Sequence, residues 1–405
     1  MPESRFGLAG ATIVLGVSGG IAAYKAADLT SFLVQAGADV HVVMTEGARQ
    51  FIQPMTFQAL TRNPVYTSAF DGWEGDSAGH VTLAARADAV MVAPATANTI
   101  ARMAHGRTDD MLGAVLLATT APVLVAPAME HHMWHHPATQ ANLSTLREWG
   151  VTIIEPEAGR LASGASGDGR LATRERLVSG LRAVLGSNGP LAGKTVVVTA
   201  GGTREAVDPV RYIGNRSSGR MGVSIAEAAI DAGARVILIA GPTVDSTPPG
   251  MDVRRVESAL DMEAAVQAAV PEGDVLVMAA AVSDFRPAEQ HAQKIKKQAG
   301  SEEMTIRMVK NPDIIAGVDG DAIVKIGFAA ETESLLENAQ AKVRSKGLRM
   351  IVANDAVRTI GSDRVAATLI YADGREPRPL EEMDKGSFAR ELIGEIARIC
   401  AGGCP

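Results

Sequence analysis

Two glycine-rich turns are the clearest places where this sequence could bind an anion. Val17-Ser18-Gly19-Gly20 follows the apolar run 12–16, and Gly201-Gly202 follows the apolar run 195–199. A turn between a strand and a helix directs backbone N–H groups and a helix N-terminus toward an anion, although an ordinary tight turn looks the same. Neither turn has the GxGxxG fingerprint of dinucleotide-binding domains. Thr45, at the end of the next apolar run, could add a hydroxyl at the first turn.

Further polar residues follow apolar runs in the first half of the chain. Pro94-Ala95-Thr96-Ala97-Asn98-Thr99 follows one run, and its Asn98 is a candidate helix cap. Residues 127–134 follow another apolar run, and histidines are concentrated there and just beyond. Histidines four positions apart on a helix can share a metal ion, but no acidic residue or cysteine is visibly placed to join them. A metal site therefore stays open as an alternative at His131, His132, His135 and His136.

The second half carries a different set of polar residues. Residues 208–222 combine arginines, hydroxyls and glycines with Asn215, just ahead of a helical pattern. These are the parts of a site for an anion or an acyl phosphate. Lys294, Lys342 and Lys346 follow later strand patterns, and Lys342 and Lys346 share one helix face. Charged runs are usually solvated, yet in an acidic chain this clustering favours a triphosphate ligand.

The elements that must position these residues belong to an α/β protein. Short apolar runs alternate with helical patterns in both halves, which is typical of parallel sheets covered on both faces. Ligands bind at the carboxyl ends of such strands, where the polar residues lie. The chain has 405 residues, too many for one ordinary core. The turn-rich break 187–190 predicts two doubly wound domains, residues 1–189 and 190–405, and the Lys-rich segment 288–301 reads as a surface flap.

Composition excludes several classes of protein. The net charge of −7 argues against a broad nucleic-acid-binding surface. The two cysteines, Cys400 and Cys404, provide neither a disulfide framework nor a zinc ligand set. The first ten residues lack a signal-peptide pattern, and the longest apolar stretch, 112–129, contains threonines and prolines that favour a buried helix and strand over a membrane span. We predict a cytoplasmic enzyme without nucleic-acid or membrane partners.

The first half resembles the homo-oligomeric flavin-containing cysteine decarboxylases, and within them the phosphopantothenoylcysteine decarboxylases. The resemblance rests on GVSGGIAAYKAADL, on His80 in GHVTLAARAD, on PATANT and on PAMEHHMW. It implies a flavodoxin-like domain whose FMN oxidises the cysteine part of the substrate so that carbon dioxide can leave. It assigns His80 as the catalytic residue and Glu130 and Met133 to the substrate. The FMN site that it implies is Ser18, Gly19, Thr45, Pro94, Thr96 and Asn98.

This half departs from the family pattern at two positions. Glu130 stands where the family usually has asparagine, and a carboxylate there repels the substrate carboxylate unless a neighbour neutralises it. Ser163 holds the place of a cysteine that many members carry in a mobile flap, and a hydroxyl is a far weaker acid than a thiol. The alternative is therefore an impaired flavin domain that serves only as an oligomerisation scaffold.

The second half resembles phosphopantothenoylcysteine synthetase, over residues 191–355 most distinctly. The resemblance implies a Rossmann-like ligase that uses CTP and Mg²⁺ to activate phosphopantothenate as an acyl-cytidylate, which the amine of cysteine then attacks. It places Asn215 at the activated acyl group, Lys294 at the reacting phosphate and Arg211 at the substrate. The CTP site that it implies is Met278, Ala279, Ala280, Asp284, Lys294, Pro312, Asp313, Ile314, Ile315, Phe328, Lys342 and Lys346.

Together the two halves predict consecutive steps of coenzyme A biosynthesis, in which 4′-phosphopantothenate and cysteine are joined and the product is decarboxylated to 4′-phosphopantetheine. The resemblance also implies a homo-oligomer, with trimeric flavin domains and dimeric ligase domains. The remaining alternative, an unrelated NAD-dependent reductase with two Rossmann-like domains, lacks the dinucleotide fingerprint with an acidic partner. The residues that would bind magnesium are not indicated by the sequence.

Overall fold

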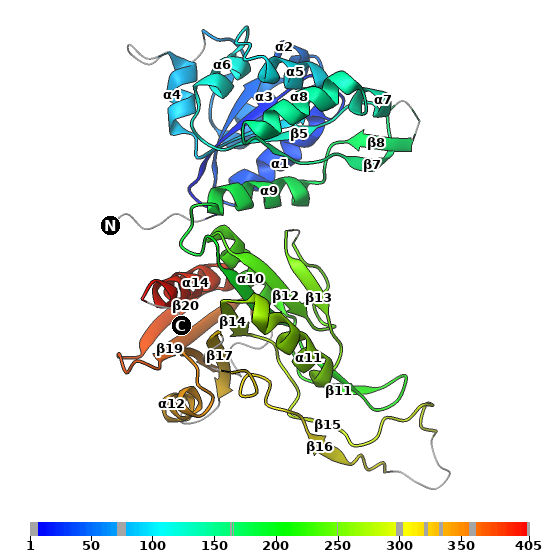
Figure 1. Cartoon of the computed structure of the whole chain (residues 1–405), viewed down its shortest axis with the longest axis vertical. Coiled ribbons are helices and arrows are strands. Elements are labelled where there is room, and N and C mark those ends of the chain that lie inside the picture. Colours follow the sequence, from blue (N-terminus) through cyan, green and yellow to red (C-terminus); the bar gives the residue numbers. More distant parts are fainter. Residues whose placement is uncertain are drawn as a thin grey trace. The chain divides into compact units, whose positions relative to one another are not determined.

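The structure is a computed structural model that describes residues 7–70, 78–162, 164, 166–248, 250–296, 303–319, 323–331, 335–355 and 362–402. The chain divides between Ser187 and Asn188 into two compact units, which are described separately below. Both are α/β units with largely parallel sheets, as predicted (Figure 1). Among the described residues, no helix is long and apolar enough to cross a membrane.

The first unit is built on a six-stranded parallel sheet in the order β3-β2-β1-β4-β5-β6. Without the two-residue edge strand β3, this order is the one typical of flavodoxin-like folds, and chain direction across the sheet reverses between β1 and β4. Ligands bind at such a switch point, so the topology already indicates where the site lies. The strands are β1 Thr12–Val17, β2 Asp39–Met44, β3 Val65–Tyr66, β4 Ala89–Ala95, β5 Val123–Pro127 and β6 Thr152–Ile153.

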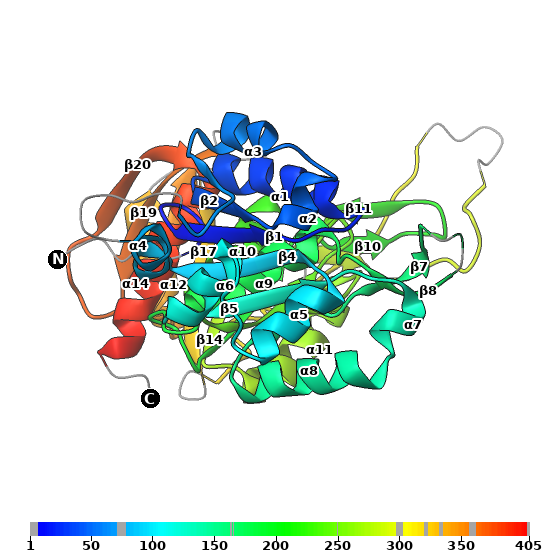
Figure 2. The same ribbon diagram turned by 90° about the horizontal axis from the view of Figure 1, so that it is seen from above.

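Helices cover both faces of this sheet (Figure 2). In β1, Ile13 and Leu15 pack on one face and Val14 on the other, which is why the strand is continuously apolar. The first face is covered by α1 Ala23–Gln35, α3 Pro54–Thr61 and α9 Arg174–Gly186. The second is covered by α4 Gly79–Arg86, α5 Ala97–Ala104, α6 Met111–Ala118 and α8 Pro137–Glu148. Three short elements complete the site: α2 Glu46–Arg49, α7 His131–Trp134 and the hairpin of β7 Glu157–Arg160 with β8 Ser166–Arg170.

The second unit has an eight-stranded sheet in the order β13-β12-β9-β14-β17-β18-β19-β20. The strands from β13 to β18 are parallel and the last two are antiparallel. The switch point lies between β9 and β14. The strands are β9 Thr195–Ala200, β12 Arg235–Ala240, β13 Asp252–Arg255, β14 Val275–Met278, β17 Val324–Glu331, β18 Met350–Asp355, β19 Arg364–Tyr371 and β20 Arg378–Asp384.

Helices again cover the sheet on both faces. Helices α10 Arg220–Asp231 and α14 Lys385–Ala401 share one core with the sheet. Helices α11 Ala259–Ala269 and α12 Leu335–Ser345 each pack on the sheet in a further hydrophobic cluster, distinct from the core of α10 and α14. Two hairpins extend away from the sheet, β10 Arg204–Ala206 with β11 Tyr212–Gly214 and β15 Phe285–Pro287 with β16 Met308–Lys310 (Figure 1).

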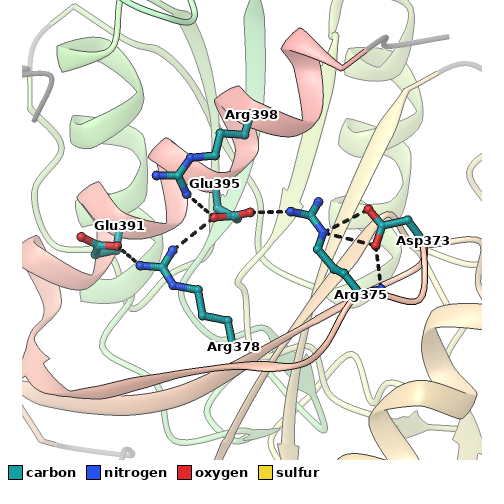
Figure 3. Close-up of polar contacts among 6 residues, drawn as sticks. All are labelled: Asp373, Arg375, Arg378, Glu391, Glu395 and Arg398. Carbon is teal, nitrogen blue, oxygen red and sulfur yellow. Dashed lines mark hydrogen bonds and ion pairs between the residues drawn. The ribbon is translucent and has the colours of Figure 1, made fainter. Parts of the chain in front are cut away.

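A network of ion pairs fastens the last helix to the antiparallel edge of the sheet (Figure 3). The Glu395 side chain is only 3% exposed. Its carboxylate accepts hydrogen bonds from Arg375 at 2.9 Å, from Arg378 at 3.2 Å and from Arg398. Arg375 also lies over the ring of Tyr371. Because one buried carboxylate collects three guanidinium groups, α14 is held against the β19–β20 connection.

Candidate active sites

The first unit contains a cavity of about 490 Å³ at the carboxyl ends of its central strands. Its walls come from the loop after β1, the loop after β4, the loop after β5 and the β7–β8 hairpin. This volume is in the range of small-molecule and cofactor sites. The lining residues are Gly19, Gly20, Ile21, Ala22, Tyr24, Lys25, Thr96, Ala97, Ala128, Met129, Glu130, Met133, Arg160, Leu161, Ala162, Gly169, Arg170 and Leu171.

The loop after β1 is rigidly placed and presents free backbone donors. The buried hydroxyl of Ser18 donates to the carbonyl oxygen of Pro94 at 2.7 Å and accepts from the N–H of Thr96 at 2.9 Å. Its only proton is therefore used to join two loops, so Ser18 positions the site. Within the described residues, the N–H groups of Gly19, Gly20 and Ile21 have no protein acceptor. These donors, ahead of helix α1, form a cradle for an anion.

Threonine side chains cap the helices that follow β4 and β2. Thr96, not Asn98, is the N-cap of α5, and its side chain accepts from the N–H of Thr99 at 3.3 Å. The prediction that Asn98 caps this helix is therefore wrong, and its exposed side chain lies in the first turn. Thr45 caps α2 in the same way, accepting from the N–H of Ala48 at 3.3 Å. The Ala93–Pro94 peptide bond is cis.

The β7–β8 hairpin is packed closely against the loop after β5. The N–H of Met129 donates to the carbonyl oxygen of Gly169 at 2.9 Å. A side chain at Gly169 would meet the carbonyl oxygen of Met129 at 2.2 Å, so only glycine permits this approach. The hairpin thereby becomes one wall of the cavity. Ser163, which comes between β7 and β8 in the sequence, lies outside the described residues.

The charges of the cavity answer the concern about Glu130. Its carboxylate accepts from the N–H of His132 at 2.7 Å, at the start of α7. Lys25, Arg160 and Arg170 line the same cavity, so basic groups outnumber the one acidic group. An anionic ligand with a carboxylate is therefore compatible with Glu130. Sequence reasoning missed these three basic residues, although Lys25 follows the first glycine turn by one helical turn.

His80 is not among the described residues that line this cavity. It is the second residue of α4, which packs on the other core of the unit. Its Nδ1 atom is buried and has no hydrogen-bond partner among the described residues. A buried imidazole nitrogen without a partner is costly, so this position calls for a ligand or another contact.

The second unit has a smaller cavity, of about 220 Å³, at its own switch point. It is formed by the start of α10, the residues after β14, and side chains from β17, β18 and β19. Gly219 caps α10 with a φ of 73°, and Gly222 lets the helix lie directly on β9, where a side chain would meet Cβ of Ala200 at 2.5 Å. The lining residues are Arg216, Ser217, Ser218, Gly219, Arg220, Met221, Gly222, Ala279, Ala280, Ala281, Phe328, Val352, Asn354, Val365 and Lys385.

Of the residues predicted for CTP, Ala279, Ala280 and Phe328 line this cavity. Sequence reasoning missed Arg220, Asn354 and Lys385. Burial lowers the pKa of Lys385, and Arg220 lowers it further while Asp363 raises it. A lysine whose charge is poorly solvated gains from an anionic ligand. No local pattern marks Lys385, because it begins a helix far along the chain from α10.

The remaining residues predicted for the ligase site are not among those that line this cavity. The side-chain amide of Asn215 donates to the carbonyl oxygen of Val282 at 3.0 Å. Asp284 is exposed, and its carbonyl oxygen accepts from the N–H of Asn311, which fixes the turn that follows. In that turn Asp313 pairs with Lys346 at 2.9 Å. Pro312, Lys342 and Met278 are half-buried. The sulfur of Met278, on β14, accepts a hydrogen bond from the hydroxyl of Thr199 on the neighbouring strand β9.

Two of the predictions need a narrower meaning. The side chains of Ile314 and Ile315 are buried in the hydrophobic cores, so only their backbone is available to a ligand. The same turn is held from below by Lys325, whose ammonium donates to the carbonyl oxygens of Val318 at 2.8 Å and Ile315 at 3.4 Å. Burial lowers the pKa of Lys325, while Asp319 and Asp313 raise it.

The guanidinium of Arg211 is already hydrogen-bonded to other groups of the protein. Its guanidinium forms a fork onto the buried carboxylate of Asp208 and also donates to the carbonyl oxygen of Ile295 at 3.1 Å. Asp208 in turn accepts from the N–H of Ile295 at 3.1 Å. The hydrogen bond from Arg211 holds the pKa of the Asp208 carboxyl well below its ordinary value. The pair therefore tethers the residue next to Lys294, whose own side chain is exposed.

Comparisons with known proteins agree with this division. Residues 3–186 match the family model "Flavoprotein", and residues 191–399 match "DNA/pantothenate metabolism flavoprotein C-terminal domain". The chain is 45% identical over 395 residues to the coenzyme A biosynthesis bifunctional protein CoaBC of Bacillus subtilis, covering 96% of this chain and 97% of that protein. It is 44% identical over 399 residues to the protein of that name from Escherichia coli, covering 96% of each. The crystal structure of the C-terminal domain of a CoaBC protein is 38% identical, with a TM-score of 0.46, and covers 53% of this chain and 99% of that one.

Proposed function

The chain belongs to the family of bifunctional coenzyme A biosynthesis proteins, and from that premise we propose how its residues carry out the chemistry. The enzyme has two activities. Its C-terminal unit ligates 4′-phosphopantothenate to cysteine, and its N-terminal flavoprotein unit decarboxylates the 4′-phosphopantothenoylcysteine that results. The resemblance described from the sequence is confirmed at the level of family and reaction, and the alternative of a NAD-dependent reductase is wrong.

For the decarboxylase we propose FMN as the flavin, held in the 490 Å³ cavity. The N–H groups of Gly19, Gly20 and Ile21, which have no acceptor in the part of the chain that the structure describes, are suited to its phosphate, and this cradle is the observation that carries the proposal. Bound FMN supplies a two-electron oxidation that lets the carboxylate leave, followed by the return of the electrons. The protein's part is to bind, orient and exclude water. Lys25, Arg160 and Arg170 attract the anionic groups of the substrate, and the β7–β8 hairpin covers it.

We propose that His80 handles a proton in this reaction, since an imidazole can both accept and donate one and the buried Nδ1 has no hydrogen-bond partner among the described residues. Because His80 is not among the residues that line the cavity of its own chain, we propose that another copy of the chain brings it to a flavin. Exposed apolar side chains on this unit, Met55, Phe70 and Val81 among them, support a homo-oligomer. A trimer of flavin units, a dimer of ligase units and a cytoplasmic location remain predictions.

For the ligase we propose CTP, with Mg²⁺, at the cavity of the second unit. The N-terminus of α10 together with Arg220 and Lys385 supplies positive charge for the phosphates. Lys294 on the tethered flap stabilises charge at the reacting phosphate, and Asn215 holds the activated acyl group. The residues that bind Mg²⁺ are left open, because the described residues near this cavity include no acidic cluster that points to them.

One experiment tests both halves. Purified full-length protein is incubated with 4′-phosphopantothenate, cysteine, CTP and Mg²⁺, and the products are identified by mass spectrometry. We expect 4′-phosphopantetheine, with the carboxylated intermediate accumulating in the His80→Asn variant. Asn215→Asp should stop the intermediate from forming while leaving decarboxylation of supplied intermediate intact. Equal turnover with ATP in place of CTP would refute the nucleotide assignment, and wild-type activity in both variants would refute the residue roles.

A further inference from the structure

A cluster of side chains that could ligate a metal lies where α7 meets the β7–β8 hairpin. It consists of His131, His135 and Asp168, and one ligand atom from each lies within 4.8 Å of the other two. His135 Nε2 is 3.1 Å from an oxygen of Asp168, and the two imidazole rings have centroids 4.5 Å apart. The histidines are four positions apart on one helical turn, so they face the hairpin together.

Backbone packing holds the third side chain in place. The N–H of Asp168 donates to Nδ1 of His131 at 3.2 Å. A side chain at Gly167 would meet that same Nδ1 atom at 2.7 Å, so strand β8 approaches α7 closely because it has glycine there. Asp168 lies 33 residues from His135, and the fold alone brings them together. The acidic partner that the sequence did not reveal for these histidines is thus present.

We propose that His131, His135 and Asp168 form a binding site for a zinc-class divalent cation. Two imidazoles and one carboxylate are the donor set of open zinc sites, in which water takes the fourth position. Ligand atoms about 2.0–2.1 Å from a tetrahedral zinc ion lie near 3.4 Å from one another, so small side-chain rotations complete the site. Mg²⁺, which prefers oxygen ligands, does not fit.

The ion would fasten the hairpin to α7 at the edge of the flavin cavity. Glu130 and Met133 of this segment line the cavity, as do Gly169 and Arg170 of β8, whereas His131, His135 and Asp168 are not among its lining residues. The site is therefore a regulatory fastening rather than part of the catalytic machinery. A hairpin that must open to admit substrate or release product is slowed when the ion joins its base to α7. This second half of the inference rests on the proposed function of the cavity.

Metal binding is tested on full-length, untagged protein, stripped with chelator and re-equilibrated with Zn²⁺ or with Mg²⁺. Elemental analysis after gel filtration and titration calorimetry give the stoichiometry and affinity. We expect one zinc per chain at this site, lost in His135→Asn and Asp168→Asn. Affinity should fall at least ~10-fold in each variant, since even residues that only orient a metal ligand contribute 10- to 100-fold. His132→Asn is the matched control, because His132 is an exposed neighbour outside the cluster and should leave binding unchanged.

Flavin content and the thermal transition show whether each variant is folded. Zinc binding that is equal in the wild type, His135→Asn and Asp168→Asn would overturn the site, as would the absence of binding to the wild type. In the second arm, Zn²⁺ should slow carbon dioxide release by the wild type and by His132→Asn but not by Asp168→Asn. Equal slowing of all three would overturn the regulatory half. Zinc stoichiometry does not depend on turnover, so failure of the decarboxylase assignment would leave the metal result readable.

Discussion

The Asp208 carboxylate offers the sharpest test of how the ligase unit positions Lys294, the lysine proposed to be catalytic. Asp208 touches no predicted ligand, yet it collects five hydrogen bonds inside the protein. One oxygen accepts from the N–H groups of Val210 and Arg211, both at 2.9 Å. The other accepts two from the Arg211 guanidinium and one from the N–H of Ile295. Asp208→Asn keeps the size of the side chain and replaces one acceptor oxygen by an NH₂ donor.

The amide cannot satisfy both sets of donors. If its oxygen faces the N–H groups of Val210 and Arg211, its NH₂ group meets three donors and the bond to Ile295 is lost. Lys294 is the neighbour of Ile295, so the flap loses its anchor next to the lysine that is proposed to act at the reacting phosphate. Misplacement of a catalytic group by about 1 Å can lower the rate about 10²-fold. We therefore expect a fall of about 10²-fold in kcat for ligation, with a smaller change in the KM for CTP.

The assay measures pyrophosphate release with phosphopantothenate, cysteine and CTP. Carbon dioxide release from supplied phosphopantothenoylcysteine serves as an internal control, because the other unit of the same chain performs it and should be unaffected. Asp245→Asn is the matched control, since Asp245 is exposed in the ligase unit. An unchanged kcat in Asp208→Asn would refute the argument that this carboxylate positions Lys294. An equal loss in Asp245→Asn would show that charge, not tethering, matters.

Three further predictions follow from the same contacts. The pKa of the Asp208 carboxyl is lower in the folded than in the unfolded protein, so the ionised group stabilises the fold. This stabilisation is fully present above the unfolded pKa of about 3.9 and is lost as the pH falls through the lower folded value. In acid titrations followed by circular dichroism, Asp208→Asn should therefore reduce the loss of stability of the ligase unit below about pH 4. Glu395→Gln should destabilise that unit by about 2 kcal/mol in denaturant unfolding (Figure 3). This is less than the ~3–5 kcal/mol lost when a fully buried pair is broken, because the three arginines are 40–65% exposed. Glu391→Gln removes an exposed pair and should cost under about 1 kcal/mol, and equal effects of the two substitutions would contradict the reasoning. Gly169→Ala should lower decarboxylase activity with ligation intact, because its new side chain meets the carbonyl oxygen of Met129, whereas Gly150→Ala, also at positive φ but in open space, isolates the effect of backbone strain; equal activity in the two variants would exclude a role for close hairpin packing.

Much of the fold could be predicted because its signals are local. Apolar runs such as 12–16 and 195–199 are continuous, since parallel strands are covered on both faces, and the glycine turns follow them directly. The cap of α5 was assigned to Asn98 rather than Thr96, because both residue types are good caps and their order depends on where the helix begins. Arg211 is predicted at the substrate from the resemblance, whereas its guanidinium pairs with Asp208. The two residues are only three positions apart, a spacing at which a turn brings opposite charges together.

The sequence by itself determined the two α/β units, the family and the two reactions, because these depend on periodicity and on motifs contained in short segments. Only the tertiary structure decided which side chains share a cavity. It placed Lys385 beside Arg220 and Asp168 beside His131 and His135, and it did not place His80 among the residues that line the cavity of its own chain. The reason is physical: a site is assembled where loops from several strands meet at one edge of a sheet, and contacts across that edge leave no periodic signal in the chain.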